Sequence, residues 1–280
     1  MDIEAALGSS CGLTIDADVR LTLESTQLLT DSIHIFAAGL SPDRTWVLAG
    51  HPARKRIGII GSSGRFVPDA KVAEGPWVSI SGHVGGWSAV GAQEIAKREW
   101  DEVQTSRLPV KLLVGATTAN YVAGFTAPDS DLVLIDLSRG KVVGETAAPF
   151  GTIQALSEGH FVVAQFEPPY SVTVVDTLGH GTSVTPEIPS EHLDSAGHWR
   201  TASVLPLDCG GLLQIIADLR SDRRISILYR AVGTTIAFVR ARPQLFPGSF
   251  VASEASERSL LAALDQGGER ALSHYTWSWE

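Results

Sequence analysis

Residues Leu132–Asp136 read LVLID, and they are followed by a glycine at Gly140 and a second extended run at Lys141–Val143. An aliphatic or β-branched run, a polar residue, a glycine and another such run form the pattern of a β-hairpin. The pattern occurs four times, which predicts a chain built from repeated hairpins. The four third-strand runs begin at Ile57, Leu132, Val172 and Ile225, and their turn glycines are Gly64, Gly140, Gly179 and Gly233.

A further extended run precedes each hairpin, so the predicted unit is four short antiparallel strands. The central apolar residues of the third strands are Ile59, Leu134, Val174 and Ile227, which lie 75, 40 and 53 residues apart. Because the first gap is about twice as long as a unit, it hides another unit. The strands preceding the hairpins are Thr45–Ala49, Tyr121–Phe125, His160–Ala164 and Leu212–Ile216. We place the hidden unit at Trp87–Val90 and Arg98–Asp101. A sixth unit follows the fourth hairpin, at Ser259–Ala262 and Ala271–Tyr275.

Six four-stranded units with a period of roughly 35 to 55 residues are typical of a β-propeller. The sixth unit reaches Glu280 after its third strand, while Gly12–Ile15 and Val19–Leu23 form a strand without a unit. We therefore predict an all-β, six-bladed propeller, with residues 1–280 as a single domain and an N-terminal strand that completes the last blade. A β-sandwich or a β-solenoid is the alternative fold. The one helix-compatible stretch, residues 93–98, is short and fits inside the second blade.

Composition excludes several classes of protein. The 280 residues carry 22 Lys and Arg against 31 Asp and Glu, a formal net charge of −9, which disfavours nucleic acid and anionic membranes as partners. The N-terminus lacks the pattern of a signal peptide, and no apolar run is long enough to cross a bilayer. The two cysteines, Cys11 and Cys209, have no CxxC spacing, so we expect neither a disulfide framework nor a cysteine zinc site. We expect a cytoplasmic, bacterial protein.

Two of the third strands resemble the blade motif of the NHL-like and SMP-30 gluconolactonase-like propellers. They are Leu134-Ile135-Asp136 with Gly140-Lys141, and Val174-Val175-Asp176 with Gly179. Residues Glu74–Trp77 also resemble the E-G-P-x-W run of those lactonases, in which the glutamate binds a divalent metal. That metal site also takes Asn and Asp from other blades, and Asn120 is the only asparagine here. The same run is similar to a plain blade connection in other bacterial propellers. We therefore expect no cofactor, and Ca²⁺ at Glu74 is what the lactonase resemblance would imply.

We expect a site at one mouth of the central channel, where the loops between blades meet the loops between second and third strands. The loop of residues 185–200 is the longest, and long loops in compact domains are often functional. It combines histidines for proton transfer with a tryptophan for stacking. The candidate catalytic residues are Glu74, Glu167, His192 and His198, and the candidate substrate-binding residues are Trp77, Phe150, Tyr170, Trp199 and Arg200.

Two functions remain open at this point. In the first, the channel mouth binds a small molecule and acts on it by lactone or ester hydrolysis, or by carboxylate-assisted cyclisation, which the resemblance implies. In the second, the propeller is a non-catalytic scaffold for protein partners, because the sequence contains no complete catalytic set. Plain structural roles are also open, since Trp199 can cap a neighbouring blade and Pro168-Pro169 can simply end strand pairing.

Overall fold

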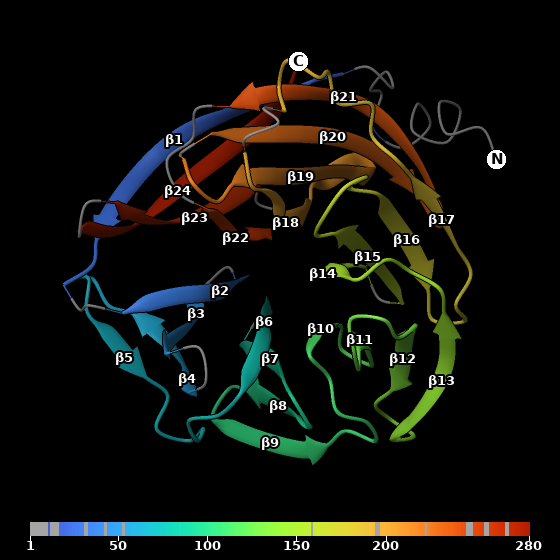
Figure 1. Ribbon diagram of the computed structural model, residues 1–280. Coiled ribbons are helices and arrows are strands. Elements are labelled where there is room, and N and C mark those ends of the chain that lie inside the picture. The colour runs from blue at the N-terminus through green and yellow to red at the C-terminus, as the bar shows by residue number, and fades with distance from the viewer. Residues whose placement is uncertain are drawn as a thin grey trace.

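A computed structural model describes residues 11, 17–30, 33–41, 44–51, 54–83, 85–157, 159–193, 197–221, 223–244, 249–254, 258–266 and 269–280. In this part of the chain the strands form six four-stranded antiparallel sheets, arranged as blades around a central axis (Figure 1). The predicted six-bladed β-propeller is therefore confirmed. Within the same residues, no helix has the length and apolar character needed to cross a membrane.

Each blade takes consecutive strands from the innermost to the outermost, except the sixth. Blade 1 holds β2 (His34–Ser41), β3 (Arg44–His51), β4 (Arg54–Ile60) and β5 (Phe66–Pro68). Blade 2 holds β6 (Trp77–His83), β7 (Gly86–Gly91), β8 (Glu94–Glu99) and β9 (Glu102–Arg107). Blade 3 holds β10 (Val114–Thr117), β11 (Tyr121–Phe125), β12 (Leu132–Asp136) and β13 (Lys141–Thr146).

Blade 4 holds β14 (Gly151–Ser157), β15 (His160–Gln165), β16 (Val172–Asp176) and β17 (Gly181–Val184). Blade 5 holds β18 (Trp199–Pro206), β19 (Gly211–Asp218), β20 (Arg224–Val232) and β21 (Thr235–Gln244), with the short 3₁₀ turn η1 (Asp208–Gly210) between its first two strands. Blade 6 holds β22 (Ser249–Glu254), β23 (Ser259–Gln266), β24 (Glu269–Trp279) and, as its outer strand, β1 (Val19–Leu28).

The ring closes through the pairing of β1 with β24. Val19 lies opposite Trp279 and Leu28 opposite Ala271, and the backbones of Asp18 and Glu280 exchange two hydrogen bonds of 2.9 Å. This confirms the predicted N-terminal strand at Val19–Leu23, while its other part, Gly12–Ile15, lies outside the described residues. Closure gives the edge of blade 6 a partner from the other end of the chain.

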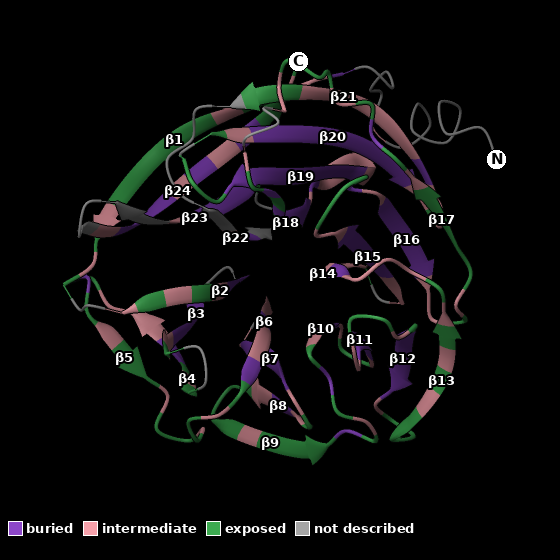
Figure 2. Cartoon of the chain, viewed as in Figure 1, coloured by how far each residue is buried: buried purple, intermediate pink, exposed green. Residues whose placement is uncertain are grey.

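The hydrophobic core is divided among the blade boundaries. Six clusters of buried apolar side chains each join two neighbouring blades, including the pair formed by blades 6 and 1. The middle strands are accordingly buried and the outer strands exposed (Figure 2). A strand buried on both faces has no polar alternation, which explains why β12 and β16 read as runs of aliphatic or β-branched residues.

The second blade differs in register from the sequence prediction. Its third strand is Glu94–Glu99, not Arg98–Asp101, and it includes all of the helix-compatible stretch except Gln93. Ile95 and Ala96 lie in this strand and are buried, so pairing with β7 and packing between blades override the local helix propensity.

The two cysteines form a disulfide bond, which corrects the expectation that they would remain unpaired. Cys11 and Cys209 are 198 residues apart in sequence, with their Cα atoms 5.8 Å apart. Ring closure brings Cys11 beside η1 of blade 5, and this proximity has no signature in the spacing of the cysteines.

Two glycines allow the innermost strands of blades 1 and 2 to approach closely. A Cβ atom on Gly82 would lie 2.4 Å from the Leu40 carbonyl oxygen, and one on Gly39 would lie 2.2 Å from the Gly82 nitrogen. We expect Gly82→Ala to lower the free energy of unfolding by about 2 kcal/mol, as overpacking does. Chemical denaturation measures this. Gly61→Ala is the control, because its nearest neighbour would be 3.6 Å away, and an equal loss in both variants would contradict the prediction.

Candidate functional site

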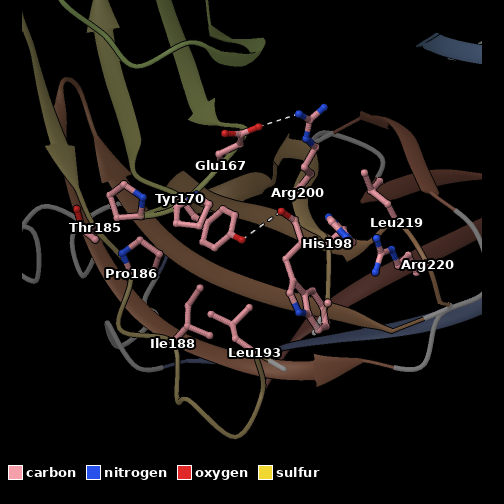
Figure 3. Close-up of a pocket in the computed structure, with 14 residues that line it drawn as sticks. Glu167, Tyr170, Thr185, Pro186, Ile188, Leu193, His198, Arg200, Leu219 and Arg220 are labelled. Atoms are coloured by element: carbon pink, nitrogen blue, oxygen red, sulfur yellow. Dashed lines mark hydrogen bonds and ion pairs between the residues drawn. The ribbon is translucent and has the colours of Figure 1, made fainter. Parts of the chain in front are cut away.

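A groove of about 930 Å³ lies at the boundary between blades 4 and 5. Three loops form it: the β15–β16 turn, the long connection from β17 to β18, and the β19–β20 loop. The first residues of β18 complete it (Figure 3). We call it the blade 4–5 groove. Its lining residues are Glu167, Pro168, Pro169, Tyr170, Thr185, Pro186, Ile188, Leu193, Gly197, His198, Trp199, Arg200, Leu219 and Arg220.

The floor of the groove is apolar and rigidly held. Tyr170, Pro186 and Trp199 are buried, and Tyr170 follows the cis peptide bond between Pro168 and Pro169. The Tyr170 hydroxyl donates a hydrogen bond of 3.2 Å to the Trp199 carbonyl oxygen, which joins the two loops across the blade boundary (Figure 3). Both aromatic side chains belong to the apolar cluster of blades 4 and 5, so the floor is continuous with the core.

A buried polar network supports this floor from below. Gln214 is fully buried in β19, and its Nε2 donates to the Tyr170 carbonyl oxygen at 3.2 Å and to Thr201 Oγ1 at 2.9 Å. Its Oε1 accepts a hydrogen bond of 2.6 Å from the Tyr229 hydroxyl. Because an unsatisfied buried amide is costly, these contacts position the β15–β16 turn firmly.

The rim is charged and exposed. Arg200 donates to Glu167 at 2.7 Å, with their side chains 54% and 63% exposed. An ion pair this exposed adds little stability. The Arg220 side chain extends along the same rim beside His198 (Figure 3), and the Arg223 guanidinium lies 5.2 Å from the centre of the Trp199 ring. The lining residues therefore include two arginines and one carboxylate, and Arg223 lies beside them, near the Asp218 carboxylate.

The titration of Tyr170 follows from this environment. Burial raises the pKa of its hydroxyl, and the nearby Glu167 carboxylate raises it further. The phenol is therefore protonated at neutral pH and acts as a hydrogen-bond donor, not as a base.

The structure brings together five of the nine residues predicted from the sequence: Glu167, Tyr170, His198, Trp199 and Arg200 all line the groove. His192 lies in the same connection without lining it, and its carbonyl oxygen accepts a hydrogen bond of 3.4 Å from Arg223. The groove is built on a blade boundary, whereas the prediction placed these residues at the channel mouth.

The remaining three residues lie elsewhere. Glu74 precedes β6 and forms an ion pair with Arg56 at 2.9 Å. Trp77 is 2% exposed and packs in the core of blades 1 and 2. Phe150 packs edge-on against Phe125 in the core of blades 3 and 4, with ring centres 5.4 Å apart. Both aromatic side chains therefore serve packing between blades.

Sequence reasoning missed the apolar wall of the groove. Ile188 and Leu193 are half-buried, Pro186 is buried, and all three lie in a connection that is mostly polar. Isolated apolar residues within a polar loop are the signal that could have identified this wall.

The opposite face holds a second cavity of about 580 Å³, at the end of the central channel. It is lined by residues of the innermost strands and by the turns after them. Some of its polar groups are bonded to the protein itself; Lys97 Nζ, for example, donates to the Ala119 carbonyl oxygen. In the described part of the chain, no three His, Cys, Asp or Glu side chains gather as metal ligands.

Comparison with known proteins shows the fold alone. No family model matches the sequence, and no curated protein matches it. A Bacteroides fragilis NCTC 9343 protein described as exported superposes with a TM-score of 0.54 at 10% identity, covering 95% of this chain and 96% of that one. The WD40 β-propeller domain of Doa1 gives a TM-score of 0.50 at 8% identity, covering 91% and 97%. Membership of the NHL-like and SMP-30-like superfamily stays a prediction.

Proposed function

We propose that the protein is a non-catalytic binding scaffold whose blade 4–5 groove holds an extended segment of a protein partner. The observation that carries this proposal is the contrast between a buried aromatic floor and an exposed arginine rim. Such a combination of an apolar centre and a charged rim is typical of recognition surfaces. A propeller supplies the rigid frame, although the fold by itself supports many functions.

The chemistry of the partner follows from the groove. The floor of Tyr170, Pro186 and Trp199 favours apolar or aromatic side chains, with Leu193 and Ile188 as the wall. The rim adds Arg200, Arg220 and Arg223, so the segment is expected to carry acidic residues beside its apolar anchor. Two arginines against one carboxylate among the lining residues give a small local excess of positive charge on a chain with a net charge of −9.

Catalysis has weaker support. Glu167 is engaged by Arg200, and both it and His198 are exposed on the rim. A positioned acid–base pair requires groups held within hydrogen-bond reach of one reacting atom. Hydrolysis or cyclisation of a small molecule at this site is therefore the second choice.

A peptide library displayed on phage tests the proposal. We expect selection on the wild-type protein to enrich segments with an aromatic or aliphatic anchor next to Asp or Glu. Leu193→Asp and Arg220→Glu should each weaken the binding of the enriched peptides at least tenfold, or about 1.4 kcal/mol, measured by fluorescence anisotropy. Leu178→Asp is the matched control, because Leu178 is 69% exposed on the β16–β17 turn, away from the groove.

Three outcomes would overturn this function. These are enriched peptides that bind all variants equally, a library that yields no enriched peptide, and a small organic molecule retained in native mass spectrometry and lost on Leu193→Asp. The last result would favour the small-molecule function.

A further inference from the structure

The Cys11–Cys209 disulfide lies at the seam where the ring closes. Cys209 belongs to η1, and its neighbour Asp208 accepts hydrogen bonds from two tryptophans of β24. The distances are 3.0 Å from Trp277 Nε1 and 2.7 Å from Trp279 Nε1. The last strand of the ring, the turn of blade 5 and Cys11 therefore meet at one point.

A buried arginine lies under this seam. Arg230 in β20 is fully buried, and its guanidinium is 3.8 Å from the centre of the Trp279 ring. Its Nη2 donates a hydrogen bond of 3.2 Å to the carbonyl oxygen of Ala17, just before β1. In the described structure its Nε and Nη1 have no hydrogen-bond partner.

The burial of Arg230 opposes the closed seam. A buried cation with unsatisfied donors is costly, and water would hydrate it if the segment at Ala17 moved away. The favourable contacts include the Asp18–Glu280 backbone pair and the ion pairs of Asp18 with Arg240 and Arg242. They also include the contacts of Arg230 itself with the Trp279 ring and the Ala17 carbonyl oxygen. The contacts thus favour the closed seam, whereas hydration of the buried Arg230 favours an open one. The disulfide adds a covalent bond that favours the closed seam.

We propose that the Cys11–Cys209 disulfide is a redox-sensitive latch that holds Ala17, two residues before β1, over Arg230. In the oxidised protein the Ala17 carbonyl oxygen accepts a hydrogen bond from the guanidinium. A dithiol reductant supplies two electrons and two protons: the sulfur–sulfur bond breaks, two thiols form, and the reductant becomes a disulfide. The reduced seam then opens locally at Ala17 and along β1, and Arg230 becomes hydrated.

Such a latch would make the closure of the seam depend on whether the compartment is oxidising or reducing. In an oxidising compartment the seam is locked, whereas the reducing cytoplasm expected from the sequence would leave it unlocked. The latch is separate from the blade 4–5 groove, which lies on the face formed by the loops between blades, so the two proposals can fail independently.

The latch is tested by hydrogen exchange on the full chain, with and without dithiothreitol. Iodoacetamide labelling followed by intact mass should find no free thiol after oxidation with oxidised glutathione and two after reduction. We expect reduction to speed amide exchange of residues 19–28 and 271–279 at least tenfold, with little change in blades 2 and 3. Cys11→Ser should show the fast exchange with or without the reductant.

A second variant keeps the test independent of cysteine substitution. Arg230→Leu removes the opposing charge, so the effect of reduction on exchange should be clearly smaller than in the wild type. The latch is overturned if two free thiols persist after oxidation or if reduction leaves the exchange of β1 unchanged. It is also overturned if all six blades accelerate equally, because that would indicate a general loss of stability.

Discussion

Replacing Trp87 with alanine is expected to cost about 4 kcal/mol of unfolding free energy, in the range measured for buried aromatic-to-alanine changes. Trp87 lies in β7 with 0% of its surface exposed. Its ring meets that of Trp46 edge-on across the boundary of blades 1 and 2, with ring centres 6.2 Å apart. The substitution removes the side chain that fills this boundary, and a blade cannot move inward to fill the space while its other face packs on the next blade.

Trp100→Ala is the matched control for this change. Trp100 lies in the β8–β9 turn and is 73% exposed, so the same substitution there should change the unfolding free energy by no more than about 0.5 kcal/mol. Urea denaturation followed by circular dichroism compares the two variants. Similar losses in both would show that the blade boundary is not the source of stability. A loss of unfolding free energy below about 2 kcal/mol in Trp87→Ala would mean that the side chains at the boundary close around the cavity. This would contradict the prediction, because each blade is held in place by packing against both of its neighbours.

The hairpins were predictable from the sequence because their signal is local. A strand such as Leu132–Asp136, a turn glycine and a second strand all lie within a dozen residues, and each can be recognised without its neighbours. The innermost strands were harder. β10 has four residues, Val114–Thr117, two of which are Gly and Ala, so its identity as a strand comes from pairing with β11 and not from its own side chains.

The site was predictable in part for the same reason. The long connection before Trp199 and the Pro168-Pro169 pair stand out in the sequence, and both do line the groove. Trp77 and Phe150 satisfied the same criterion of aromatic residues between blades, yet they pack in the core. The packing of side chains that are far apart in sequence decides which blade boundary forms a groove. The disulfide was unpredictable on similar grounds, since its two cysteines meet only in the closed ring.

The other large effect is expected at Asp208, where Asp208→Ala should cost about 3 kcal/mol at pH 7, because hydrogen bonds to charged groups are worth about 1.5–3 kcal/mol. One carboxylate holds both Trp277 and Trp279, and it also accepts from Arg258 Nε at 2.8 Å. Its loss leaves two indole N–H groups of β24 without their acceptor at the seam. Asp101→Ala is the control, because the Asp101 side chain is 95% exposed.

The loss of unfolding free energy in Asp208→Ala should also depend on pH, and it should become smaller in acid. Burial alone raises the pKa of this carboxyl, but the hydrogen bonds from Trp277, Trp279 and Arg258, together with the Arg258 charge, outweigh burial and lower the pKa. A carboxyl whose pKa is lower in the folded state stabilises the protein above its unfolded pKa of about 4 and loses that contribution as the pH falls through the folded value. The stability difference between wild type and Asp208→Ala should therefore be constant from pH 6 to 8 and shrink below pH 4.

Denaturation with urea at several pH values measures this difference directly. A gap that stays constant down to pH 3 would mean that the carboxylate charge is not what holds the two tryptophans. A gap that widens on acidification would reverse the sign of the linkage and contradict the lowered pKa. The expected narrowing would show that the ionised Asp208 carboxylate stabilises the seam of the ring through Trp277 and Trp279, next to the cysteine that closes the disulfide.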